Sequence, residues 1–248
     1  MHVKKISLWL FFSGLILWGG LPRVNFAQET VMVGHFSTSS PEDAQPQGWE
    51  PMEFKKITNH TTYDLVREDG IGVIKAHSNG ASSGLMHRIS IDPMQYPIIS
   101  WRWKTRNMLK NGDVTLKSGD DYPARIYITF AYDGSRLGFF EKTKYNAAKL
   151  IYGEYPPMGA INYIWDGKAP QGTSVPNAYT SRVMMIVVES GSNNLNTWVE
   201  ERQNIREDYR KLFGQEPPMI SGVAIMTDTD NTGEEATTFY GDIIFSKK

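Results

Sequence analysis

The chain has 248 residues, of which 40% are hydrophobic and 12% aromatic, enough for one large core but few for two average domains. Its 26 basic and 27 acidic side chains leave a net charge of −1, so no overall field attracts a nucleic acid or an anionic membrane surface, and neither is predicted as a partner. The sequence contains no Cys, which excludes disulfides as a source of stability.

The first 27 residues have the pattern of an export signal. Lys4 and Lys5 precede an apolar stretch over residues 6–18, which is shorter than the roughly 20 residues that a membrane span needs. We expect cleavage after Ala27, with an uncleaved anchor as the alternative, and a single domain over residues 28–248 without a membrane span. No Cys follows the apolar stretch, so the lipid anchor of bacterial lipoproteins is excluded. The predicted location is periplasmic or secreted.

From residue 30 onward, short runs of alternating polar and apolar residues are separated by turn residues, which is typical of antiparallel β-structure. Asp69-Gly70 predicts a tight hairpin turn between strands over residues 63–66 and 72–77, because Gly adopts the positive φ that such turns require. Further strands are predicted over residues 85–91, 98–104, 125–132, 183–189, 222–227 and 237–245.

Two segments break the strand pattern. Residues 141–152 are compatible with a helix but precede Pro156 and Pro157, so we expect a partly helical excursion on a loop. Residues 204–207, NIRE, have the spacing of a capping box, and Gly214 ends the helix that it predicts. Together the elements predict an all-β fold, a two-sheet antiparallel β-sandwich or jelly roll with one or two short helices.

The segment WRWK separates aromatic from basic side chains. With the period of a strand, Trp101 and Trp103 lie on one face and Arg102 and Lys104 on the other. The two tryptophans are either core residues, which we favour, or a platform that stacks on a sugar ring. Trp165, between loops rich in Pro and Gly, has the same two interpretations, as a packed anchor or as the lining of a ligand cleft.

Alternation along ARIYITF places Arg125 and Tyr127 together on the polar face of another strand. If this strand shares a sheet with WRWK, these side chains join Arg102 and Lys104 in one polar surface. We therefore predict that Arg102 and Arg125 lie on the same side of one sheet.

Carboxylates stand close to this predicted surface. Asp120 and Asp121 either neutralise its guanidinium groups or bind a hydroxylated ligand with them. Neighbouring carboxylates repel each other, so we expect one of the two to have a raised pKa if it is buried, as a general acid requires. Glu189, at the end of a predicted strand, is the other carboxylate expected at a sheet edge, and its pairing with Asp120 or Asp121 is the one candidate for glycoside chemistry.

The run DTDNTG raises the question of a calcium loop. Asp228, Asp230 and Thr232 take the first, third and fifth positions of EF-hand spacing, and Gly233 takes the sixth. The twelfth position is Phe239 instead of a bidentate Glu, and the flanking residues are β-like, so an EF-hand is excluded. Calcium bound in another geometry and a hydrogen-bonded turn both stay open, and we favour the turn.

The segments WRWK, GDDYPAR and TDTDNTG occur in this order in domain-of-unknown-function family 3047, a family of exported bacterial proteins that the chain resembles from about Phe36 onward. The resemblance implies no established activity. It does imply a β-sandwich similar to galactose-binding-like and carbohydrate-binding domains, in which the closing strand FYGDIIF lies beside the first strand.

We therefore predict an exported, non-catalytic protein that binds a carbohydrate or a cell-envelope glycan. The alternatives are a glycan hydrolase or lyase, and an assembly protein of the envelope. No catalytic residue is assigned, calcium is the one candidate cofactor, and the oligomeric state is left open. The candidate ligand-binding residues are Arg102, Lys104, Asp120, Asp121, Arg125, Tyr127, Trp165 and Glu189.

Overall fold

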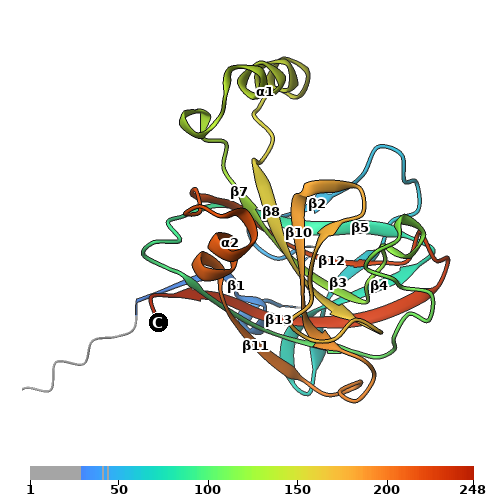
Figure 1. Cartoon of the computed structure of the whole chain (residues 1–248). Helices are drawn as coiled ribbons and strands as arrows, with labels where there is room; N and C mark the ends of the chain where they lie inside the picture. The colour runs from blue at the N-terminus through green and yellow to red at the C-terminus, as the bar shows by residue number, and fades with distance from the viewer. Residues whose placement is uncertain (1–28, 41, 44) are drawn as a thin grey trace, which may run out of the picture.

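The computed structural model of the chain describes residues 29–40, 42–43 and 45–248. The predicted export signal, residues 1–27, lies outside the described residues. Two β-sheets pack face to face to form a sandwich, and the helices lie outside it (Figure 1). The predicted all-β sandwich is confirmed. Three short 3-10 helices lie in its connections, at Phe36–Thr38, Lys117–Gly119 and Gly134–Arg136.

The first sheet, which we call sheet A, has the strand order β11-β6-β13-β4-β3, and β1 pairs with the other part of β13. The first and last strands of the sandwich are therefore neighbours, as the family resemblance implied. The strands of sheet A are β1 (Thr30–Gly34), β3 (Thr62–Glu68), β4 (Ile71–Asn79), β6 (Ile98–Thr105), β11 (Val199–Asn204) and β13 (Glu235–Ser246).

The second sheet, sheet B, has the strand order β2-β5-β12-β7-β8-β10-β9. Neighbouring strands are antiparallel except β8 and β10, which run parallel because the chain returns through β9 before it enters β10. This parallel pair is the one departure from the antiparallel arrangement among the described strands. The strands of sheet B are β2 (Trp49–Met52), β5 (Ser82–Ile91), β7 (Ala124–Phe130), β8 (Gly159–Asp166), β9 (Ser174–Asn177), β10 (Thr180–Ser190) and β12 (Ile220–Asp228).

Four aromatic side chains at the centre of the sandwich join the two sheets. Trp101 and Trp103 of β6 face Tyr163 and Trp165 of β8, with ring centroids 5.4 Å apart for Trp101 and Tyr163 and 6.1 Å apart for Trp103 and Trp165. All four side chains are buried. Their packing confirms the core interpretation of Trp101 and Trp103, and the same environment makes Trp165 a core residue.

The turns and helix caps that the local sequence predicts are present in the structure. Asp69 and Gly70 both have positive φ, 53° and 80°, in the tight turn that joins β3 to β4. The side chain of Asn204 accepts a hydrogen bond from the backbone N–H of Glu207 at 3.2 Å and caps α2 (Ile205–Phe213). Gly214 ends α2 in the left-handed conformation, with φ 71°.

The segment expected to be partly helical is a regular helix, α1 (Phe139–Tyr152), of 14 residues. Gly153, at φ 81°, ends it and donates its N–H to the carbonyl of Lys149. This helix stands away from the sandwich at the top of Figure 1. Among the described residues, no helix is both long and apolar enough to cross a membrane.

Candidate functional site

The outer face of sheet B carries a groove of about 730 Å³. Along β7, Ala124, Ile126 and Ile128 face the core, so the alternation of the strand turns Arg125 and Tyr127 to the outer face. Four segments form the walls and the floor of the groove: residues 53–57, β7, the β9–β10 hairpin and the end of β12. A hollow of about 840 Å³ lies beside residues 32–39 and 45–49, but the described residues that line it form no buried charged pair.

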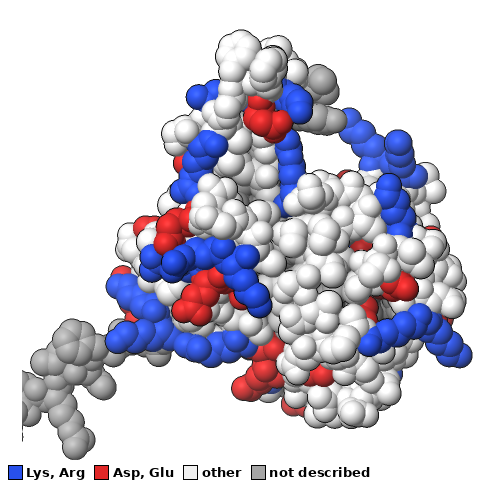
Figure 2. All heavy atoms as spheres, viewed as in Figure 1, with Lys and Arg blue, Asp and Glu red and all other residues white. Residues whose placement is uncertain are grey.

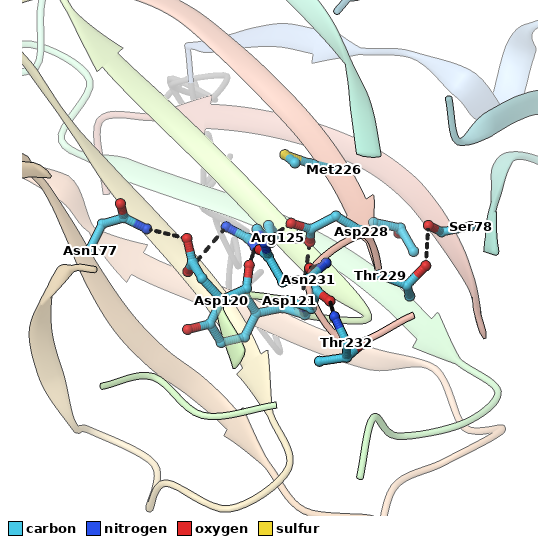
Figure 3. A network of polar contacts seen from close by, with 12 residues as sticks. Ser78, Asp120, Asp121, Arg125, Asn177, Met226, Asp228, Thr229, Asn231 and Thr232 are labelled. Atoms are coloured by element: carbon cyan, nitrogen blue, oxygen red, sulfur yellow. Dashed lines mark hydrogen bonds and ion pairs between the residues drawn. The ribbon is translucent and has the colours of Figure 1, made fainter. Parts of the chain in front are cut away.

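A buried ion pair forms part of the floor. The Nε atom of Arg125 donates to Oδ1 of Asp228 at 2.8 Å, and Nη2 of Arg125 donates to Oδ2 of the same carboxylate (Figure 3). The two side chains are 2% and 3% exposed. The pairing is therefore bidentate and shielded from solvent, which fixes the orientation of the guanidinium plane.

The remaining donors of Arg125 hold neighbouring groups in place. Its Nη1 atom donates to the hydroxyl of Tyr127 at 2.9 Å, and Nη2 also donates to the backbone carbonyl of Asp120. The ring of Tyr122 lies 4.3 Å from the guanidinium carbon. Arg125 thus ties the β12 carboxylate, a tyrosine hydroxyl and the loop before β7 into one rigid unit.

Asp120 retains hydrogen-bonding capacity inside this unit. Its Oδ2 atom accepts from Nδ2 of Asn177 at 2.8 Å, which fixes the carboxylate (Figure 3). Its Oδ1 atom is 3.8 Å from Nη1 of Arg125 and accepts no hydrogen bond from the described part of the chain. Asp120 is only 6% exposed yet is one of the residues that line the groove, so Oδ1 is a buried and unsatisfied acceptor of a groove-lining residue.

The guanidinium of Arg125 lies among the carboxyl groups of Asp120, Asp121 and Asp228. Burial raises the pKa of Asp228, the Arg125 guanidinium opposes this shift, and the carboxylates of Asp121 and Asp120 add to it. Burial also raises the pKa of Asp121. For Arg125, burial opposes the charge, but the carboxylate of Asp228 keeps the pKa well above its ordinary value. One guanidinium therefore serves several carboxyl groups.

Three carboxylates at the end of β12 and in the loop before β7 form a candidate metal cluster. One oxygen each from Asp121, Asp228 and Asp230 lies within 4.8 Å of the others. The sequence had suggested Thr232 as the third ligand, but the hydroxyl oxygen of Thr232 accepts from the backbone N–H of Glu234 at 3.4 Å. The structure therefore adds Asp121 to the candidate cluster, and Thr232 as a ligand stays a prediction.

The contacts of this cluster suit a hydrogen-bonded turn better than a calcium site. The carboxylate of Asp121 accepts from the backbone N–H of Asn231 at 3.3 Å and of Thr232 at 2.6 Å. The N–H of Gly233 donates to the carbonyl of Thr229 at 2.9 Å. A cation would share Asp228 with the positive guanidinium of Arg125, which weakens its binding. Calcium at Asp228 and Asp230 stays a prediction.

An aromatic ring borders the groove at its exposed side. Tyr179 is 57% exposed, and its hydroxyl donates to the carbonyl of Lys117 and accepts from Nδ2 of Asn231, both at 3.2 Å. Phe54, in the segment of residues 53–57, also lines the groove and is 39% exposed. Sequence reasoning missed Phe54, Asn177 and Tyr179, because each lies in or next to a loop where no periodic pattern marks it.

The structure separates the predicted polar surface into two. Arg102 and Lys104 lie on β6 of sheet A, whereas Arg125 and Tyr127 lie on β7 of sheet B. Since both pairs face outward, they lie on opposite faces of the sandwich, and the predicted common surface is wrong. Lys104 instead pairs with Glu68 at 2.5 Å.

Two other candidate residues lie away from the groove. The Trp165 side chain is fully buried, and its Nε1 atom donates to the carbonyl of Gly191 at 3.0 Å. Glu189 is the register partner of Trp165 and accepts from the backbone N–H of Ser190 at 3.0 Å. Neither residue lines the groove, so the structure does not bring Glu189 to Asp120 there.

Comparison with known proteins gives one family match. The model of a family described as "Protein of unknown function (DUF3047)" matches residues 47–244. No curated protein matches the sequence.

Several solved structures resemble the chain at low identity. The family 30 carbohydrate-binding module of the cellulosomal cellulase CEL9D-CEL44B of Clostridium thermocellum is 9% identical, with 88% of this chain and 97% of that one covered and a TM-score of 0.42. A carbohydrate-binding module specific for non-crystalline cellulose, CBM28, is 11% identical, with 88% and 92% covered and a TM-score of 0.36. The glycoside hydrolase domain of Endo-D from Streptococcus pneumoniae R6 is 9% identical, with 81% and 21% covered and a TM-score of 0.31. Similarities of this size carry no argument about the ligand of this chain.

Proposed function

We propose a function for this chain, which belongs to the DUF3047 family of proteins of unknown function: it binds a carbohydrate in the groove on the outer face of sheet B. The pattern of residues 1–27 supports a periplasmic or secreted location, where the ligand is a cell-envelope or extracellular glycan.

One observation carries the proposal. The Oδ1 atom of Asp120 is a buried acceptor without a hydrogen-bond donor in the described part of the chain, and Asp120 lines the same groove as the exposed ring of Tyr179. A sugar ring has an apolar face that stacks on an aromatic ring and a rim of hydroxyl groups that donate to carboxylates. The groove offers both kinds of contact within one site.

The rigidity of the floor favours binding. Asn177 fixes Oδ2 of Asp120, and Arg125 fixes the backbone carbonyl of the same residue. An acceptor that is already oriented loses little conformational freedom when a ligand arrives, so more of the interaction energy appears as affinity.

The contacts favour binding over glycan cleavage. A glycosidase needs two carboxyl groups on either side of the scissile bond, with freedom to exchange protons. Asp228 is held by the guanidinium of Arg125, Asp121 is held by two backbone N–H groups, and Glu189 does not line the groove. Of the carboxylates that the sequence analysis paired for glycoside chemistry, Asp120 lines the groove without Glu189, and the other carboxyl residues that line it with Asp120 and Asp228 are Glu53 and Asp230.

A glycan array, followed by titration calorimetry with the best ligand, tests the proposal. We expect Tyr179→Ala to weaken binding by roughly fivefold, the loss of about 1 kcal/mol of ring stacking. Asp120→Ala is expected to weaken it further. Phe139→Ala, which removes an exposed aromatic ring outside the groove, is the matched control and leaves the affinity unchanged. Absence of binding to every glycan, or equal affinity in Tyr179→Ala and the control, would overturn the proposal.

A further inference from the structure

Helix α1 exposes three large apolar side chains. Phe139, Phe140 and Leu150 are 78%, 81% and 89% exposed, higher fractions than for any other large apolar residue in the described part of the chain. Single exposed apolar residues are ordinary on protein surfaces, but a group of this size on one short helix marks an interaction surface.

The exposed residues lie on one face of the helix. At 100° per residue, Phe139, Thr143, Ala147 and Leu150 form one stripe, and Phe140 borders it. All five are exposed. Tyr145 lies on the opposite side of the helix and is only 3% exposed. We call the stripe with Phe140 the apolar face of α1.

Contacts on the buried side hold the apolar face away from the sandwich. The hydroxyl of Tyr145 donates to the carbonyl of Pro157 at 3.3 Å and accepts from Nη1 of Arg182 at 3.1 Å. Nη2 of Arg182 pairs with the carboxylate of Glu141 at 2.9 Å. The helix is therefore fixed to β10 through its polar side, and no described segment of the chain covers the apolar face.

Positive charge flanks the apolar face. Lys142 and Lys149 lie along one side of it and Lys144 along the other, and all three side chains are exposed. Glu141 is the one carboxylate of the helix, and Lys144 and Arg182 pair with it. Figure 2 shows uncharged side chains at the top of the molecule, with basic side chains on either side below them.

We propose that α1 docks the protein onto a membrane surface that contains anionic lipids. Helices that lie in the membrane interface combine aromatic and aliphatic residues on one face with lysines beside it, so that the apolar groups enter the acyl boundary while the ammonium groups meet the phosphates. The overall charge of −1 offered no attraction to such a surface, but the local charge of α1 does.

The size of the face favours a membrane over a second protein. A stable protein interface buries about 800 Å² on each partner. The two aromatic side chains offer roughly 150 to 250 Å² each, and the lysines around the face are a residue type depleted in protein interfaces. None of the described side chains of α1 lines the groove on sheet B, so membrane docking is independent of the proposed carbohydrate binding.

Vesicle co-sedimentation tests the proposal on a protein that begins at Gln28, because all described strands and helices lie between residues 30 and 246. We expect binding to vesicles of equal parts phosphatidylglycerol and phosphatidylcholine, and at least about tenfold weaker binding to phosphatidylcholine alone, since each lysine near an anionic surface strengthens binding about fivefold. The double variant Phe139→Ser, Phe140→Ser is expected to lower the partition coefficient at least about tenfold. Replacing Lys142, Lys144 and Lys149 by Gln is expected to remove the lipid preference and the salt dependence.

Met94→Ser, which removes another exposed apolar side chain on the surface of the sandwich, is the matched control and is expected to bind like the wild type. The proposal is overturned if the wild type does not sediment with anionic vesicles, or if the double Phe variant sediments equally well. It is also overturned if sedimentation velocity without lipid reveals a dimer that the double Phe variant abolishes, because the occupant of the face is then a second copy of the chain.

Discussion

The guanidinium of Arg125 and the carboxylate of Asp228 form a bidentate pair across β7 and β12, neighbouring antiparallel strands of sheet B. Met226 is the register partner of Arg125, so Asp228, two residues later, points to the same outer face. Both charges are buried, at 2% and 3% exposure. Removal of one partner therefore leaves the other charge without compensation in a site that water barely reaches.

We expect Arg125→Ala to lower the free energy of unfolding by about 3–5 kcal/mol, because it leaves the Asp228 carboxylate buried and unpaired. Urea denaturation followed by tryptophan fluorescence measures this change. Arg88→Ala is the matched control, since Arg88 pairs with Glu50 at 2.6 Å but is 61% exposed. It is expected to cost about 1 kcal/mol or less. Similar losses in the two variants would show that the buried pair contributes no more than a surface pair.

The acidic turn after β12 gives a second prediction. Because the oxygens of Asp121 and Asp228 already accept hydrogen bonds from backbone N–H groups and from Arg125, we expect neither calcium nor a chelator to change the melting temperature. Asp121→Ala is expected to cost about 1–3 kcal/mol, since two backbone N–H groups lose their acceptor. Differential scanning calorimetry measures both effects.

Calcium binding at the acidic turn would be visible as a change in melting temperature. A bound calcium ion at 100 times its dissociation constant stabilises the folded state by about 2.7 kcal/mol. A calcium-dependent rise in melting temperature that disappears in Asp230→Ala would show that Asp121, Asp228 and Asp230 form a metal site.

The third prediction concerns Glu201 on the edge strand β11. Burial, together with the nearby carboxylate of Glu189, raises the pKa of Glu201 from 4.5 to about 8. The folded state therefore holds this proton over a pH range in which the unfolded chain releases it. The stabilisation is complete below pH 4.5 and is lost as the pH rises to about 8. The loss amounts to about 5 kcal/mol at most.

Glu201→Gln removes this titration. We expect the stability of the variant relative to the wild type to rise between pH 4.5 and about 8, as measured by urea denaturation at a series of pH values. Glu200→Gln changes the neighbouring exposed residue and is the control. A flat difference for Glu201→Gln would mean that Glu201 is ionised in the folded protein at neutral pH.

Features set by neighbouring residues were predictable from the sequence. The Asp69-Gly70 turn and the Asn204 cap depend on contacts within a few residues, so the sequence pattern contains the required information. Period-two alternation also predicted correctly which side of its own strand each residue occupies, as the burial of Trp101 and Trp103 confirms.

The site was less predictable, because alternation does not tell which sheet a strand joins. Arg102 and Arg125 were assigned to one surface, but β6 pairs with β11 and β13 while β7 pairs with β12 and β8. Strand pairing between distant segments depends on the packing of the whole chain. The groove residues Asn177 and Tyr179 meet Asp120 only through such packing, and no short motif contains them together.

The pairing of β1 with β13 has a consequence for the order in which the fold is completed. During synthesis the N-terminal strand emerges first, yet its hydrogen-bonding partner is the last strand of the sandwich to be made. The same late strand also separates β6 from β4, so sheet A has no continuous middle until β13 is present. Contacts between such distant segments slow folding, because a long stretch of chain has to be ordered before they form. The nascent protein therefore exposes the edges of an unfinished sheet A until β13 has been made, and such edges favour aggregation during that interval.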